Sequence, residues 1–292
     1  MTTAQSDGGP PAGPIVTRML LGVQLRRLRE AKGLTREEAG YAIRGSESKI
    51  SRMELGRVSF KERDVLDLLT LYDVTDDRER DEALSLMRNA NSPGWWYRYN
   101  DLLPTWFQSY LGLEAAASLI RTYEVQFVPG LLQTEAYARA VILLGHASAH
   151  PQEIERRVKL RLERGYLLSR PTPPEFWAVV DEGVLRRPIG GPAVMREQIH
   201  ALIKLTQLPW VRLQIIPFLS GGHAAAGGAF SILRFPEPDI QDVVYVEQLT
   251  SALYLDKPDD VEEYTEAMSR LSIDATLPGQ TAHILGEILH EI

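Results

Sequence analysis

The sequence predicts an α+β fold, in which an N-terminal all-α module of five helices precedes an α+β domain with an antiparallel sheet. Between about residues 15 and 90 the apolar residues recur at helical spacing with no proline between them, as Leu21, Leu25 and Leu28 illustrate. Between about residues 211 and 255, short runs rich in β-branched and aromatic residues are separated by turn residues, which is typical of strands. Such segregation of the two types of element favours an α+β class.

Local signals mark where the N-terminal helices begin and end. Gly33 is expected to end the first helix, and Thr35 followed by Glu38 forms a capping box that opens the second. Ser46 is expected to cap the third helix, because a serine hydroxyl satisfies a free N–H of the first turn. The fourth and fifth helices are expected at about residues 65–72 and 76–90.

Composition divides the chain into four segments. Residues 1–14 are rich in glycine and proline, so we expect a disordered tail. Residues 15–90 form the helical module, and the break NSPGWW opens an aromatic linker at residues 91–109. Residues 110–292 are expected to form the α+β regulatory or partner-binding domain.

The larger domain is expected to mix helices and strands. Helices are expected at about residues 134–144, 151–168, 194–207, 259–273 and 280–290. Strands are expected in the segments EFWAVVDE, VRLQIIPF, GAFSILRF, VVYVEQL and SALYL. The order of these elements favours an antiparallel sheet.

Charge is distributed unevenly along the chain. The net charge is −7, but residues 18–61 alone carry +6, so that the remainder carries −13. A basic module joined to an acidic body indicates two different tasks, of which nucleic-acid binding suits the basic part. The absence of cysteine excludes disulfides and thiolate metal sites, and the absence of a run of about 18 apolar residues argues against a membrane span. We expect a cytoplasmic protein.

The segment GLTREEAGYAIRGSESKISRMELGR, residues 33–57, predicts two short helices joined by a tight turn. This is a helix-turn-helix, whose second helix fits the major groove of duplex DNA. Ile50 and Met53 lie three residues apart and are expected to face the core. Ser48, Lys49, Ser51 and Arg52 are then expected to point outward.

Several residues of this segment are candidates for DNA contact. Ser48 and Arg52 lie four residues apart on one helical face, where both can reach base edges. Arg36, near the start of the preceding helix, is placed for a phosphate. Glu47 either accepts a hydrogen bond from a cytosine amino group or simply favours the helix N-terminus. The predicted DNA-binding residues are Arg36, Ser46, Glu47, Ser48, Lys49, Ser51, Arg52 and Arg57.

The same segment resembles the Xre/Cro-type helix-turn-helix of bacterial regulators, over about residues 20–74. The shared features are Gly33-Leu34-Thr35, Glu38-Ala39, Gly45, Ser48, Ile50-Ser51-Arg52 and Glu54-x-Gly56-Arg57. The resemblance implies a structural ion pair between Arg29 and Glu54. Gly40 departs from the small residue, commonly alanine, of most members, and glycine costs about 1 kcal/mol in a helix interior.

Motifs of the larger domain carry a second resemblance. The segments VPGLLQTEAYARA, DEGVLRR, GGPAVMREQ, IIPF, GAFSILRF and VVYVE are similar to the C-terminal domain of an actinobacterial group of Xre-type regulators, the WhiJ-like or antitoxin-like family. The resemblance implies a transcription regulator whose C-terminal domain binds a protein or a small effector. It also implies a small partner protein encoded nearby.

Enzyme motifs are missing from the sequence. The segment GGHAAAGGAF lacks the lysine of a phosphate-binding loop, and the histidines show no metal-ligand spacing. We therefore predict no catalytic residue, no metal site, no cofactor and no enzymatic activity. The glycine-rich segment is either a mobile loop between strands or a lid over a ligand pocket. The apolar residues 127–132 form either a buried turn or an exposed patch, and the aromatic residues 95–107 fill either a core or an interface.

Together these observations predict a sequence-specific transcription regulator that binds a double-stranded DNA operator. A palindromic operator requires two-fold symmetry, so we expect a homodimer. The protein would be nucleoid-associated when it is bound to DNA. The alternative is an antitoxin-like module that mainly sequesters a small partner protein.

Overall fold

The computed structural model describes residues 13–292, and the predicted tail at residues 1–14 lies almost wholly outside the described residues. The chain divides into two compact units. Unit 1 extends to Tyr97 and includes the short segment Glu237–Ile240, whereas unit 2 comprises Arg98–Pro236 and Gln241–Ile292. Among the helices of residues 13–292, none is both long and apolar enough to cross a membrane.

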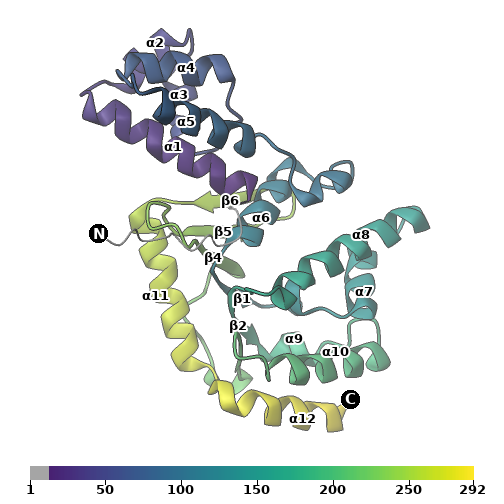
Figure 1. Cartoon of the computed structure of the whole chain (residues 1–292). Helices are drawn as coiled ribbons and strands as arrows, with labels where there is room; N and C mark the ends of the chain where they lie inside the picture. The colour runs from purple at the N-terminus through teal and green to yellow at the C-terminus, as the bar shows by residue number, and fades with distance from the viewer. Residues whose placement is uncertain (1–12) are drawn as a thin grey trace, which may run out of the picture. The chain divides into compact units, whose positions relative to one another are not determined.

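Unit 1 is built from the first helices of the chain, drawn in purple to blue in Figure 1. They are α1 (Pro14–Ala31), α2 (Arg36–Ala42), α3 (Glu47–Glu54), α4 (Glu62–Leu71) and α5 (Asp77–Ala90). One apolar cluster joins all five, and it includes Leu25, Ile43, Ile50, Leu68 and Met87. The predicted all-α module of five helices is therefore confirmed.

The predicted helix caps are present in unit 1. Thr35 Oγ1 accepts a hydrogen bond from the Glu38 N–H, while the Glu38 carboxylate accepts one from the Thr35 N–H at 2.7 Å. Ser46 Oγ accepts from the Lys49 N–H at 3.2 Å and so caps α3. These local bonds fix the beginning of each of the two short helices.

Two glycines set how closely the helices around α3 approach each other. A Cβ added at Gly40 would lie 2.9 Å from the carbonyl carbon of Ser46, so only glycine lets α2 pack against the start of α3. A Cβ at Gly22 would lie 2.5 Å from the carbonyl oxygen of Glu54, so α1 touches the end of α3 in the same way. This is the physical reason for the unexpected glycine at position 40.

Unit 2 contains a six-stranded sheet with the order β3-β2-β1-β4-β5-β6. The strands are β1 (Leu119–Glu124), β2 (Glu175–Asp181), β3 (Val211–Ile216), β4 (Phe230–Arg234), β5 (Val243–Glu247) and β6 (Ala252–Leu255). The α+β class is confirmed, but the expectation of an antiparallel sheet is wrong for half of it. Strands β1, β2 and β3 are parallel to one another, and β4, β5 and β6 continue the sheet in antiparallel fashion.

The parallel half exists because helices connect its strands. Parallel neighbours require crossover connections, and here α7 and α8 lie between β1 and β2 in the chain, while α9 and α10 lie between β2 and β3. The sequence did not indicate β1, whose residues LIRTYE contain two charged side chains. Without β1, the crossovers that make the sheet mixed could not be recognised.

The helices of unit 2 cover both faces of the sheet. They are α6 (Thr105–Ala116), α7 (Glu135–Gly145), α8 (Pro151–Gly165), α9 (Glu182–Arg186), α10 (Pro192–Leu205), α11 (Pro258–Asp274) and α12 (Thr281–Glu291). Figure 1 shows α11 on one side of β1 and β2, with α7 to α10 on the other. Met268 and Leu271 of α11 pack on Tyr123, Val179 and Ile232 of the sheet.

The apolar and aromatic segments left open by the sequence are largely buried. Val128, Leu131 and Leu132 are buried, so residues 127–132 form a turn packed inside unit 2. The segment predicted as an aromatic linker contains a 3-10 helix, Trp95–Tyr99, and the start of α6. Within it, Trp96 and Tyr99 are buried, whereas Tyr97 is 60% exposed.

Candidate functional site

Helix α3 has one buried and one exposed face. Ile50 and Met53 are each 1% exposed and belong to the core of unit 1. Ser46, Glu47, Ser48 and Arg52 are exposed, and Ser51 is partly exposed. The Arg52 Nε donates to the Ser48 carbonyl oxygen at 3.2 Å, which keeps this guanidinium along the outer face of the helix. The polar face of α3 is therefore available to a ligand outside the unit.

A buried charge cluster anchors the end of α3. The carboxylate of Glu54 accepts two hydrogen bonds from Arg29, at 2.5 and 3.1 Å, and one from Arg36 at 2.9 Å. Arg29 also donates to the carbonyl oxygen of Leu34 at 2.7 Å. The hydrogen bond to Glu54 raises the pKa of Arg29, and burial raises that of the neighbouring Tyr72 hydroxyl. Every charge in this cluster is thus compensated, which buried ions require.

Arg36 links this cluster to the surface. Its Nε is held by Glu54, and its side chain is 35% exposed. The predicted contact with a DNA phosphate therefore involves a guanidinium that Glu54 already orients. Arg57, another predicted contact residue, is exposed and directly follows Gly56, whose φ is 64°.

Lys49 differs from the sequence-based expectation. Its ammonium bonds the carboxylate of Asp64 at 2.6 Å, and the Asp64 side chain is only 4% exposed. Lys49 was expected to point outward, but it ties α3 to α4 instead. The flexible four-carbon stem allows this, and helical periodicity cannot reveal where such a stem turns.

Sequence reasoning missed two exposed residues beside α3. Tyr41 on α2 is 87% exposed, and Arg44 occupies the turn with a left-handed φ of 53°. Both flank the start of α3. A signal for Tyr41 was present, because Ala39 and Ile43 form the buried stripe of α2 and Tyr41 falls between them.

The net charge of unit 1 changes sign along the sequence. Residues 18–61 carry +6, but residues 62–90 contain nine Asp and Glu against four Lys and Arg. Residues 18–61, which contain α2, α3 and most of α1, therefore carry a net charge opposite in sign to that of residues 62–90. A polyanion is attracted to the segment that contains the helix-turn-helix and repelled by the following one.

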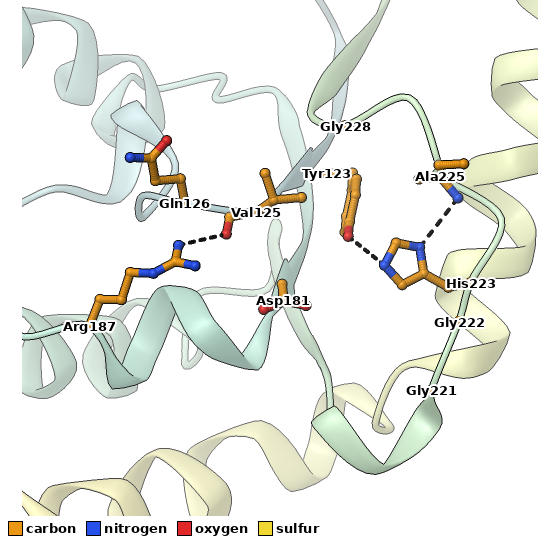
Figure 2. A pocket seen from close by; sticks show the side chains of 11 residues that line it. Tyr123, Val125, Gln126, Asp181, Arg187, Gly221, Gly222, His223, Ala225 and Gly228 are labelled. Atoms are coloured by element: carbon orange, nitrogen blue, oxygen red, sulfur yellow. Dashed lines mark hydrogen bonds between the residues drawn. The ribbon is translucent and has the colours of Figure 1, made fainter.

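Unit 2 contains a cavity of about 670 Å³ beside the glycine-rich loop 221–228, shown in Figure 2. Tyr123 and His223 point toward each other, and the Tyr123 hydroxyl lies 2.8 Å from the imidazole Nε2. On the opposite side, Arg187 donates to the carbonyl oxygen of Val125 at 3.1 Å. Asp181 caps α9 through the Gly183 N–H at 2.8 Å. The glycine-rich loop thus borders a cavity, which fits both interpretations of it, a mobile loop and a lid.

Residues 13–292 contain no cluster of metal-ligating side chains. No group of three or more His, Asp or Glu side chains lies close enough together to hold a metal ion in that part of the chain. The histidine of the loop instead bonds Tyr123 and accepts from the Ala225 N–H at 3.3 Å.

Comparison with known proteins assigns both units. Residues 20–83 match a model described as a helix-turn-helix domain. Residues 107–287 match a model described as a domain of unknown function, DUF5753. No curated protein and no solved structure matches the chain.

Proposed function

Since the chain belongs to the DUF5753 family and carries an N-terminal helix-turn-helix domain, we propose that it is a sequence-specific transcription regulator of the Xre type. Helix α3 enters the major groove of a DNA operator, and unit 2 controls this binding. The observation that carries the proposal is the division of α3 into a face buried through Ile50 and Met53 and a polar face that contains Ser48 and Arg52.

The contacts fall into two groups. Ser48 and Arg52 read base edges, with Ser46, Glu47 and Ser51 beside them, because they lie on the exposed side of α3. Arg36, Arg44, Arg57 and Tyr41 lie around α3 and bind phosphates, which fixes the position of the helix on the duplex. Lys49 contributes by holding α3 on α4 rather than by reading a base.

The role of unit 2 is regulatory. We propose that it forms a homodimer matching a palindromic operator, and that it receives a signal from an effector or from a small partner protein, as in the WhiJ-like group. No catalytic step is assigned to it. Its acidic charge, part of the −13 outside residues 18–61, suits a basic partner and supports the antitoxin-like alternative. The site of action is the nucleoid in the cytoplasm.

The proposal is tested by mapping DNA occupancy in cells and then measuring the affinity of the purified protein for the recovered operator. Arg52→Ala should weaken specific binding by about 5- to 150-fold, since a bidentate arginine contact contributes about 1–3 kcal/mol. The control is Arg78→Ala, which removes another exposed arginine from the acidic helix α5 and should leave affinity unchanged. Equal losses in both variants, or no binding to any genomic fragment at low salt, would refute the proposal.

A further inference from the structure

A second cavity of unit 2, of about 740 Å³, lies on the sheet face opposite α11. Its lining comes from β1, β4 and β5, from α6 and α8, and from the turn at residues 125–133. The volume is in the range of small-molecule sites, about 300–1,000 Å³. The cavity lies along the face of β1, where the antiparallel strand β4 adjoins the parallel β1-β2-β3 half of the sheet.

One wall of the cavity is aromatic. Tyr110 and Tyr245 stack with ring centroids 4.2 Å apart, and Phe107 stacks on Tyr110 at 5.7 Å. Trp106 is adjacent to Phe107 and also lines the cavity. These residues make one side of the cavity aromatic and largely apolar.

Two charged residues of the lining neutralise each other. Arg164 makes a bidentate ion pair with Glu114, at 2.9 and 2.8 Å, and both side chains are buried. The guanidinium also lies over the rings of Phe107 and Tyr110. This pair has its charge and hydrogen bonds satisfied, so it belongs to the scaffold of the cavity.

Arg161 and Glu124, two further ionisable residues of the lining, have no ion-pair partner within residues 13–292. The Arg161 guanidinium donates to the Gln133 amide oxygen at 3.1 Å, and within residues 13–292 it has no carboxylate at ion-pair distance. Glu124 has no hydrogen bond or ion pair to its carboxylate in the same part of the chain. Both side chains line the cavity, yet they do not pair with each other.

The surroundings oppose the charge of both groups. Burial lowers the pKa of Arg161 to about 10, with the neighbouring Arg164 adding to the effect. Burial raises the pKa of Glu124 to about 8, and the like charge of Glu247 contributes. Glu247 itself accepts a hydrogen bond from the Tyr245 hydroxyl at 2.8 Å. In the empty protein the cavity therefore holds Arg161 without a partner carboxylate and keeps the Glu124 carboxyl protonated up to about pH 8.

We propose that this cavity binds a small amphoteric molecule, with its anionic group on Arg161, its cationic group on Glu124 and a flat apolar body against the aromatic wall. The inference deepens the proposed function, because this molecule would be the effector of the regulator. A simple acid would leave Glu124 unpaired, and a simple amine would leave Arg161 unpaired. A molecule that carries both charges satisfies both groups at once.

The test uses the full-length protein and probes of the stated chemistry. Phenylalanine, tryptophan and the dipeptide Phe-Phe are titrated by calorimetry, each beside its N-acetyl and carboxamide forms. At least one unblocked probe is expected to bind about tenfold or more tightly than either of its blocked forms. In Arg161→Gln, the unblocked probe should bind no more tightly than its carboxamide form. In Glu124→Gln, it should bind no more tightly than its N-acetyl form. Arg156→Gln, on the outer side of the same helix and paired with Asp101, is the matched control and should bind normally.

Several outcomes would overturn the proposal. They are the absence of binding by every probe at millimolar concentration, equal binding of blocked and unblocked forms, and undiminished binding in both cavity variants. If Arg161→Gln does not fold, Glu124→Gln still tests the proposal, because a neutral amide is compatible with the empty cavity and this variant should fold. Operator affinity is measured separately with and without the best probe. If a probe binds the cavity but the protein binds no genomic DNA operator, the proposed function is refuted and the cavity assignment stands. If the protein binds its operator but no probe binds the cavity, only this inference is refuted.

Discussion

The two units differ in how completely their inward-facing charges are paired, although unit 2 also contains one fully paired example, Arg164 with Glu114. In unit 1, the carboxylate of Glu54 is surrounded by the guanidinium groups of Arg29 and Arg36, and each hydrogen bond is made. In unit 2, Arg161 and Glu124 line a cavity without reaching a partner of opposite charge. The paired charges around Glu54 hold helices together, whereas ionisable side chains without a partner in a cavity are candidates for binding a ligand.

The largest expected effect comes from breaking the compensated cluster. Glu54→Ala leaves the buried Arg29 without its carboxylate, so unit 1 should lose about 3–5 kcal/mol of stability. Chemical denaturation followed by circular dichroism measures this loss. Glu30→Ala, which removes an exposed carboxylate from α1, should cost less than about 1 kcal/mol. Equal stabilities of the two variants would contradict the role given to Glu54.

A second destabilising substitution tests the close approach of α2 to α3. Gly40→Ala places a Cβ 2.9 Å from the Ser46 backbone, so overpacking should destabilise unit 1 by about 1–3 kcal/mol. Gly286→Ala is the matched helical control, because nothing lies within 4 Å of its added Cβ. That variant should be neutral or more stable by up to about 1 kcal/mol. Stabilisation by Gly40→Ala, measured by the same denaturation, would disprove the close approach.

The next expected effect separates Lys49 from Arg52. Lys49→Ala leaves the buried Asp64 carboxylate without its ion-pair partner, so stability should fall by about 1–3 kcal/mol. Arg52→Ala removes an exposed side chain and should change stability by less than about 0.5 kcal/mol. Thermal unfolding of both variants measures the difference. An unchanged melting temperature in Lys49→Ala would restore the expectation that this lysine points freely outward.

The last comparison concerns the pH dependence of unit 2. The pKa of Glu124 is about 8 in the folded protein against an ordinary value of 4.5, so the folded state holds this proton more tightly than the unfolded state. Its contribution to stability is complete below about pH 4.5 and is lost as the pH rises toward about 8. Burial is the main cause of the raised pKa, the like charge of Glu247 adds to it, and Arg161 and Arg164 oppose it.

Glu124→Gln removes this titration. The melting temperature of wild type should fall relative to the variant between about pH 5 and pH 8 and stay parallel at higher pH. Calorimetric scans of both proteins across this range provide the comparison. Parallel curves over the whole range would show that the Glu124 carboxyl is not desolvated.

Local features of this fold could be predicted from the sequence, while features that join distant residues could not. The caps at Thr35 and Ser46, and the buried face of Ile50 and Met53, depend on neighbours within one helix and were predicted. The outward face of α3 followed from the same periodicity. Such signals come from hydrogen bonds and side chains only three or four residues apart.

The missed features depend on tertiary position. The pair Lys49–Asp64 spans 15 residues and two helices, and Arg161 lies 37 positions after Glu124. The parallel half of the sheet depends on β1, whose strand signal is weakened by Arg121 and Glu124. Sequence patterns describe the elements, but the cavity arises only when β1, α6 and α8 meet.

The most direct test of the central claim is a structure of the protein bound to its operator. The account predicts α3 in the major groove, with Arg52 within hydrogen-bond distance of a base edge and the Arg29–Glu54 pair intact behind it. A complex in which α3 faces away from the duplex, or in which Arg52 contacts no nucleotide, would contradict the account.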